Sequence, residues 1–147
     1  MKWFYIIRTS HNDILGFGIT IHLPKRLVDG YCNPSAARQE FTQLYYGENL
    51  HINQLEKYIK RVYSSQRLNF TNNRTRKLEW IDPAFDISTE ELIEVVEDRI
   101  VGYPLPIKRV RSQFLPYTVD SNDIFKTINE NPELFLEDIK FDNNDEN

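Results

Sequence analysis

Three polar residues in the first half of the chain are of types that can act together on a phosphate ester. Tyr5 stands inside a short apolar run, Arg26 follows Gly18 by eight residues, and Glu56 adjoins apolar residues at helical spacing. Arginine offers a rigid fork of donors that fits phosphate oxygens, and a carboxylate is the usual protein ligand of Mg²⁺, which keeps most of its waters. A tyrosine hydroxyl has an ordinary pKa of about 10, so it needs a nearby cation before it can act as a base. Phosphodiester cleavage requires a positioned water, neutralisation of charge on the phosphate and help for the leaving oxygen, and these residue types agree with that chemistry.

The first two elements that must position these residues are predicted to be strands. Residues 4–7 and 14–20 are short β-prone runs on either side of a polar turn at 10–13, a pattern that predicts a hairpin. Gly16 and Gly18 lie inside the second run. Glycine within a strand indicates a bulge, or a place where another backbone or a ligand comes close.

The next elements are predicted to be a short helix, a strand and a longer helix. Pro24 suits the first position of a helix and Gly30 suits its end, so residues 25–29 are expected to be helical. Residues 41–46 are strand-like. The apolar residues that follow fall at helical spacing: Ile52, Leu55, Ile59 and Val62.

The remaining elements are predicted from capping signals and prolines. Ser88 and Glu91 form a capping box at the start of a helix. Asn131 and Pro132 indicate a further helix start, with Leu134, Phe135 and Ile139 to bury. Residues 103–118 contain three prolines, which favours loop or edge structure.

Four short motifs occur in a fixed order along this part of the chain. They are WFYII at 3–7, GFGIT at 16–20 with KRL at 25–27, LEK at 55–57 and LEW at 78–80. The ordered set resembles the GIY-YIG nuclease superfamily, and it looks closest to the viral (phage) and bacterial branch whose second motif reads K-I-G. The resemblance covers residues 3–81. The tyrosine that names the second motif falls at Gly16 here, and members of the K-I-G branch also lack it, which leaves Tyr5 as the main tyrosine candidate.

The resemblance implies a fold, an activity and roles for three residues. The fold is a small antiparallel three-stranded sheet flanked by helices, and the activity is hydrolysis of a DNA phosphodiester with one divalent metal, Mg²⁺ or Mn²⁺. By motif, Tyr5 matches the tyrosine that is a candidate general base or water positioner. Arg26 matches the arginine that contacts the phosphate, and Glu56 matches the glutamate that binds the metal. The alternative is a nuclease-like module without turnover that binds nucleic acid or a protein partner.

We expect one α+β domain with an unstructured end. A length of 147 residues favours a single domain. Residues 1–140 are assigned to it, with a nuclease-like core at 3–81 and extra C-terminal helices in an extension at 82–140. Residues 141–147 are acidic and rich in asparagine, and are expected to be a disordered tail.

Charge is unevenly distributed along the chain. Residues 1–118 hold 16 Lys and Arg against 13 Asp and Glu, whereas residues 119–147 hold 2 against 9. A mildly basic body can still present a basic face to DNA. The candidate phosphate-binding residues, which could equally line a solvated loop, are Arg61, Arg67, Arg74 and Arg76. The acidic C-terminus could compete with DNA for the basic face or bind a protein partner, and homo-oligomer formation is open.

A second mixture of cations and aromatic residues occurs at 108–117. Lys108, Arg109 and Arg111 precede Phe114 and Tyr117. This pattern is compatible with single-stranded nucleic acid, and a purely structural role is the alternative.

Composition excludes several classes of protein. Hydrophobic residues make up 40% and charged residues 27%, which is typical of a globular domain and excludes wholesale disorder. No apolar run is long enough to span a membrane, so we expect no membrane partner. Cys32 is the single cysteine, so no intrachain disulfide can form. A reducing cytoplasm is therefore the expected setting, which for a phage protein is that of the bacterial host.

Overall fold

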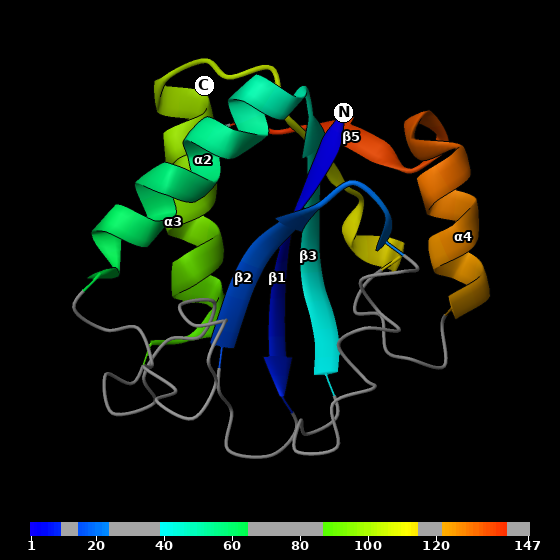
Figure 1. The fold of residues 1–147 in the computed structure, drawn as a ribbon, viewed down its shortest axis with the longest axis horizontal. Helices are drawn as coiled ribbons and strands as arrows, with labels where there is room; N and C mark the ends of the chain where they lie inside the picture. The colour runs from blue at the N-terminus through cyan, green and yellow to red at the C-terminus, as the bar shows by residue number, and fades with distance from the viewer. Residues whose placement is uncertain (10–14, 24–38, 65–86, 115–121, 141–147) are drawn as a thin grey trace, which may run out of the picture.

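Five strands form one antiparallel sheet, and helices lie on both of its faces (Figure 1). The computed structural model describes residues 1–9, 15–23, 39–64, 87–114 and 122–140. The strands follow the order β2-β1-β3-β4-β5 across the sheet. Their bounds are β1 Lys2–Thr9, β2 Leu15–Thr20, β3 Gln39–Gly47, β4 Lys108–Val110 and β5 Leu136–Asp138. The helices are α2 Asn49–Val62, α3 Thr89–Gly102 and α4 Asn122–Glu130, with short 3-10 turns η3 Ser112–Phe114 and η5 Pro132–Leu134.

Strand β1 lies inside the sheet and contributes side chains to two separate cores. It pairs with β2 on one side and β3 on the other. Residues 3–7 are at most 1% exposed. Because successive side chains of a strand point to opposite faces, Phe4 and Ile6 enter one core while Trp3, Tyr5 and Ile7 enter the other.

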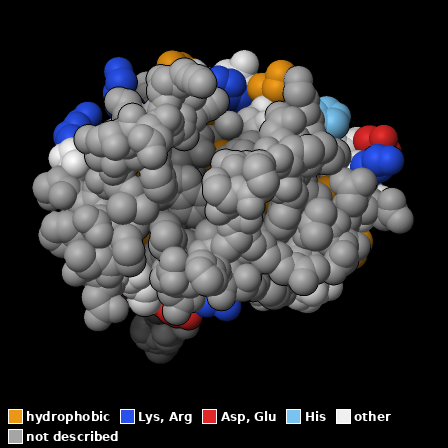
Figure 2. Space-filling model, turned by 60° about the horizontal axis from the view of Figure 1, so that its bottom comes forward, with side chains coloured by type: hydrophobic (Ala, Val, Ile, Leu, Met, Phe, Trp, Pro, Cys, Tyr) orange, Lys and Arg blue, Asp and Glu red, His pale blue; other side chains and the backbone are white. Residues whose placement is uncertain are grey.

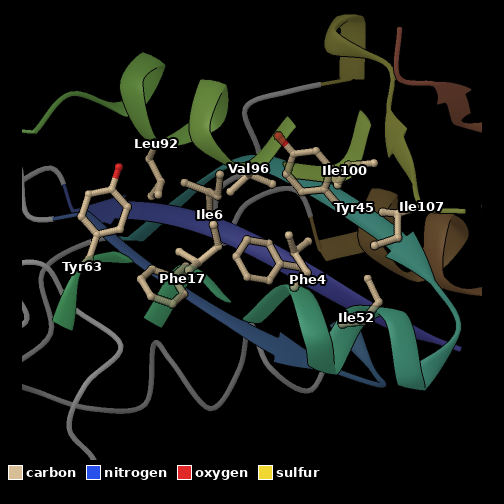
Figure 3. Packing of buried hydrophobic residues seen from close by; sticks show 12 residues of the cluster. Phe4, Ile6, Phe17, Tyr45, Ile52, Tyr63, Leu92, Val96, Ile100 and Ile107 are labelled. Atoms are coloured by element: carbon tan, nitrogen blue, oxygen red, sulfur yellow. The ribbon is translucent and has the colours of Figure 1, made fainter. Parts of the chain in front are cut away.

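The first core lies between the sheet and the helices α2 and α3 (Figures 1 and 3). Ile52, Leu55 and Ile59 of the predicted apolar stripe are buried there, which confirms that helix. Val62 is instead 42% exposed, because α2 ends at this residue and the buried position passes to Tyr63. Helix α2 extends over β1 and β2, and α3 packs beside it.

The N-terminus of α3 is capped as the sequence predicts. The Ser88 hydroxyl accepts a hydrogen bond of 3.0 Å from the backbone N–H of Glu91. This bond satisfies one of the amides that the first turn of a helix leaves without a partner.

The second core lies between the opposite face of the sheet and α4. Its aromatic rings meet edge to face: the ring centroids of Tyr5 and Phe41 are 5.5 Å apart, and those of Phe41 and Phe125 are 5.1 Å apart. This geometry is favourable for aromatic pairs beyond the area that they bury. The fully enclosed members are Trp3, Tyr5, Ile7, Leu23, Phe41, Leu44, Val110, Phe125 and Ile128.

The α+β class is confirmed, but the expectation of a three-stranded sheet is wrong. The three expected strands are β2, β1 and β3, and the extension adds β4 and β5 beside β3. The helix expected from Asn131 and Pro132 is instead the turn η5 followed by β5. Leu136 pairs with Val110, so this segment makes sheet hydrogen bonds rather than helical ones.

Several sequence predictions fall outside the described residues. These are the turn at 10–13, the helix at 25–29, the motif at 78–80 and the acidic tail at 141–147. The pairing of β1 with β2 nevertheless confirms the two strands of the first hairpin. Within the described ranges, none of the helices has both the length and the apolarity needed to cross a membrane.

Substitution of two isoleucines of α4, four residues apart, tests whether this helix covers the second core. Ile128 is fully buried and Ile124 is 43% exposed. We expect Ile128→Ala to lower the free energy of unfolding by about 2–5 kcal/mol, because it removes buried methyl groups and leaves a cavity. Ile124→Ala is the matched control and should change the stability by no more than about 0.5 kcal/mol. Urea denaturation measures both variants, and equal losses would mean that α4 does not seal this face.

Candidate functional site

The first two motifs are paired residue by residue across β1 and β2. Tyr5 lies opposite Gly18, and Ile7 lies opposite Gly16. Directly opposite residues of an antiparallel pair point to the same face. Directly across β2, Tyr5 therefore faces backbone rather than a side chain, whereas Phe17 occupies the other face.

The glycines of β2 fit the close approach that the sequence suggests. Gly16 and Gly18 are both buried. Without a Cβ, they let a neighbouring backbone or a ligand come nearer to the sheet than any other residue would. The Tyr5 side of β2 therefore has the least bulky surface of the three core strands.

Tyr5 itself is enclosed by protein. Its exposed fraction is 0%, and its ring packs against Phe41. A general base or water positioner must reach the water that it activates. Tyr5 therefore lies opposite the glycine strand, but bulk water does not reach it in this conformation.

Glu56 lies on α2, which covers the face of the sheet opposite to the Tyr5 side chain. It stands two residues before Tyr58, which contacts Arg99 of α3. Two residues correspond to about 200° around a helix, so Glu56 is on the flank of α2 that faces away from α3. Glu97 of α3 bonds to residues of β3 and β4, so α3 lies over that part of the sheet. The flank of α2 that faces away from α3, and Glu56 with it, is therefore nearer to β2, the strand at the opposite edge of the described sheet. The structure does not bring Glu56 and Tyr5 into contact on one face, and the edge of β2 lies between them.

Glu56 could bind a cation only at a site where water supplies most of the ligands. Its carboxylate is 3.5 Å from the Lys60 ammonium, and its side chain is 17% exposed. An ion pair between half-buried side chains at i, i+4 on one helix contributes little to stability, so a cation could displace the lysine. Mg²⁺ can bind through one or two carboxylates and keep several waters. Among the residues that the structure describes, no group of three or more His, Cys, Asp or Glu is arranged to hold a metal.

The predicted phosphate-binding residues are described only in part. Arg61 is exposed on the last turn of α2, beside Lys60. Described Lys and Arg side chains are seen around the rim of the face in Figure 2. The candidates that lie outside the described residues are Arg26, Arg67, Arg74 and Arg76.

An ion-pair network that sequence reasoning missed joins four elements. Arg109 of β4 donates to Glu97 of α3 at 2.6 Å and to Glu137 of β5 at 2.7 Å. The Tyr45 hydroxyl of β3 donates to the other oxygen of Glu97 at 3.0 Å. Burial, followed by the negative charge of Glu97, raises the pKa of Tyr45 well above its ordinary value. For Arg109, burial acts to lower the pKa, but the bonds to its two carboxylate partners outweigh it and the net pKa is raised.

The cations that the sequence places at 108–111 all have partners within the protein. Lys108 is 3.8 Å from Glu133 and 4.0 Å from Asp138, and the Arg111 guanidinium lies over the Phe114 ring at 5.5 Å. The signal was present in the sequence as complementary charge. Lys108 and Arg109 are matched across the sheet by Asp138 and Glu137, and opposite charges in register stabilise a strand pair.

Comparison with known proteins adds no relative. No protein-family model matches the chain, and no curated protein or solved structure is significantly similar to it.

Alkaline titration tests the packing of Tyr63 between α2 and α3. Burial, followed by the negative charge of Glu91 and the nearby Tyr58, raises the pKa of Tyr63 from 10.0 to about 12. The unfolded chain therefore loses this proton at lower pH than the folded chain. Stability from Tyr63 is fully present below pH 10 and is lost as the pH rises to about 12.

Tyr63→Phe should reduce this alkaline loss of stability, by an amount on the order of 1–2 kcal/mol. Urea midpoints measured at pH 10 and at about pH 12 give the comparison. Tyr103→Phe removes an exposed hydroxyl and should follow the wild-type curve. An identical pH dependence in wild type and Tyr63→Phe would contradict the assignment.

Proposed function

We propose that the chain is a metal-dependent DNA endonuclease of the kind that its resemblance to GIY-YIG nucleases implies. The observation that carries this proposal is the register of β1 and β2, which sets Tyr5 of the first motif directly opposite Gly18 of the second. The order that follows, β3 and then α2 with Glu56, is also the order of the motifs.

The scissile phosphate is proposed to lie at the outer edge of β2. Backbone rather than side chain borders the Tyr5 ring there, and the Glu56 flank of α2 is on the same side of the molecule. Arg26 is proposed to neutralise the phosphate, and Glu56 to hold Mg²⁺ or Mn²⁺ by exchanging its bond to Lys60. The cation would supply Lewis-acid chemistry. A body that is basic over residues 1–118 favours an anionic substrate.

A second candidate is a nuclease-like module that binds nucleic acid without turnover. The observation that favours it is the enclosure of Tyr5 at 0% exposure, together with the position of Glu56 on the other side of the sheet. Cleavage would require the two residues to act across the edge of β2, whereas binding makes no such demand.

Nicking of supercoiled plasmid separates the two candidates. We expect relaxed circles to form with Mg²⁺ or Mn²⁺ and not with EDTA. Glu56→Gln should reduce nicking to background, because the amide cannot replace the charge that holds the cation. Glu130→Gln, which changes an exposed glutamate at the end of α4, is the matched control and should nick normally. Binding of DNA without any nicking by the wild type would select the second candidate.

Substitution of Arg26 and Tyr5 tests whether they serve one phosphate. Arg26→Ala should lower the rate about 10²–10³-fold, as does the loss of one donor to developing charge. Tyr5→Phe keeps the ring in its core and should lower turnover more than DNA affinity. If both act in one step, the double variant should be much less impaired than the product of the single losses. Multiplicative losses in single-turnover rates would place the two residues at separate steps.

A further inference from the structure

Arg99 is held between two tyrosine rings at the seam of α2 and α3. Its guanidinium carbon is 4.0 Å from the ring centroid of Tyr58 on α2, and 3.5 Å from that of Tyr103, the residue that follows α3. Both distances are within the range of a cation–π contact. The three side chains therefore form one stack across the seam.

The charge of Arg99 is not neutralised within the described part of the chain, where no carboxylate forms an ion pair with it. Its neighbour Asp98 points about 100° away around the helix. Arg109, by contrast, has two carboxylate partners. Among the described residues, the positive charge of Arg99 is therefore met by two aromatic faces and not by a carboxylate.

Tyr103 is the outer ring of the stack. It is 62% exposed although one of its faces rests on the guanidinium. A ring that is already held flat loses little conformational entropy when a second flat group stacks on it. Bases of single-stranded nucleic acid stack on such rings, and a neighbouring arginine adds to the affinity.

We propose that the Tyr58–Arg99–Tyr103 stack is a docking platform for one base of a single-stranded nucleic acid. Arg61 stands three residues after Tyr58, on the same side of α2, so it can supply a cation for an adjoining phosphate. Exposed carboxylates along the outer side of α3 direct that phosphate toward α2: Glu90, Glu94 and Asp98.

This platform goes beyond the proposed endonuclease site. Glu56 is on the opposite flank of α2, so the strand that stacks on Tyr103 is not held at the phosphate that would be cleaved. The platform would also operate in a protein without turnover.

Fluorescence anisotropy with a labelled oligo-thymidine, on the full chain in EDTA, tests the platform. Tyr103→Ala should weaken binding about 5-fold to 100-fold, the range for loss of one stacked base. Tyr103→Phe keeps the ring and should bind within about twofold of wild type, a change too small to count as a lost stack. Arg61→Gln should lower the salt dependence of binding by about one phosphate contact. Circular dichroism of each variant shows whether it is folded.

Each outcome decides one proposal. Equal affinity of Tyr103→Ala and wild type, or no binding of the oligonucleotide by wild type, overturns the platform. Absence of plasmid nicking together with Tyr103-dependent binding refutes the endonuclease and leaves the platform standing. Nicking by a wild type whose binding does not depend on Tyr103 refutes the platform alone.

Discussion

Burial of β1 on both faces is the constraint on which the other elements depend. A strand inside an antiparallel sheet with two apolar faces needs a cover on each side, because neither core can be left to water. Helices α2 and α3 cover the face of Phe4 and Ile6, and α4 covers the face of Trp3, Tyr5 and Ile7. A shift of β1 by one residue would exchange the two sets of side chains. The position of Tyr5 is therefore fixed by packing before any chemistry is considered.

Polar contacts then fix how the added strands join this sheet. Glu97 accepts bonds from Tyr45 and Arg109, so a single carboxylate ties α3 to β3 and β4. Partly buried charges are stable only when each has partners, and here Glu137 supplies the second one for Arg109. Removal of the Glu97 carboxylate would leave the Tyr45 hydroxyl without this acceptor and would leave Arg109 with Glu137 alone. The same fold contains Arg99, whose partners are aromatic rings rather than carboxylates. Arginine thus makes ion pairs at one place in this fold and contacts with aromatic rings at another.

The sequence predicted the strands and helices whose residue patterns lie within a single element. The β-prone run at residues 4–7, the apolar stripe of α2 up to Ile59 and the capping box at Ser88 all depend on neighbours within one element, and all are observed. The strands β4 and β5 were missed because each has only three residues and their pairing is set by partners distant in the sequence. The exposure of Val62 depends on where α2 ends, which periodicity alone does not specify. For the candidate site, the sequence predicted that the strands of the first two motifs form a hairpin, but the register that sets Tyr5 opposite Gly18 and the side of the sheet on which Glu56 lies are properties of the tertiary fold.

The pairing of β3 with β4 has a consequence for how the chain folds. Tyr45 and Arg109 are register partners although a large part of the chain separates them. The strands β2, β1 and β3 pair with fewer intervening residues, so they can associate at a smaller loss of chain entropy. Docking of β4 and β5 must instead close a long loop, and contacts of this kind slow folding. The motif-bearing strands are therefore expected to assemble first in refolding, and the C-terminal strands to complete the sheet in a later, slower step that pulse-labelled hydrogen exchange at β4 would resolve.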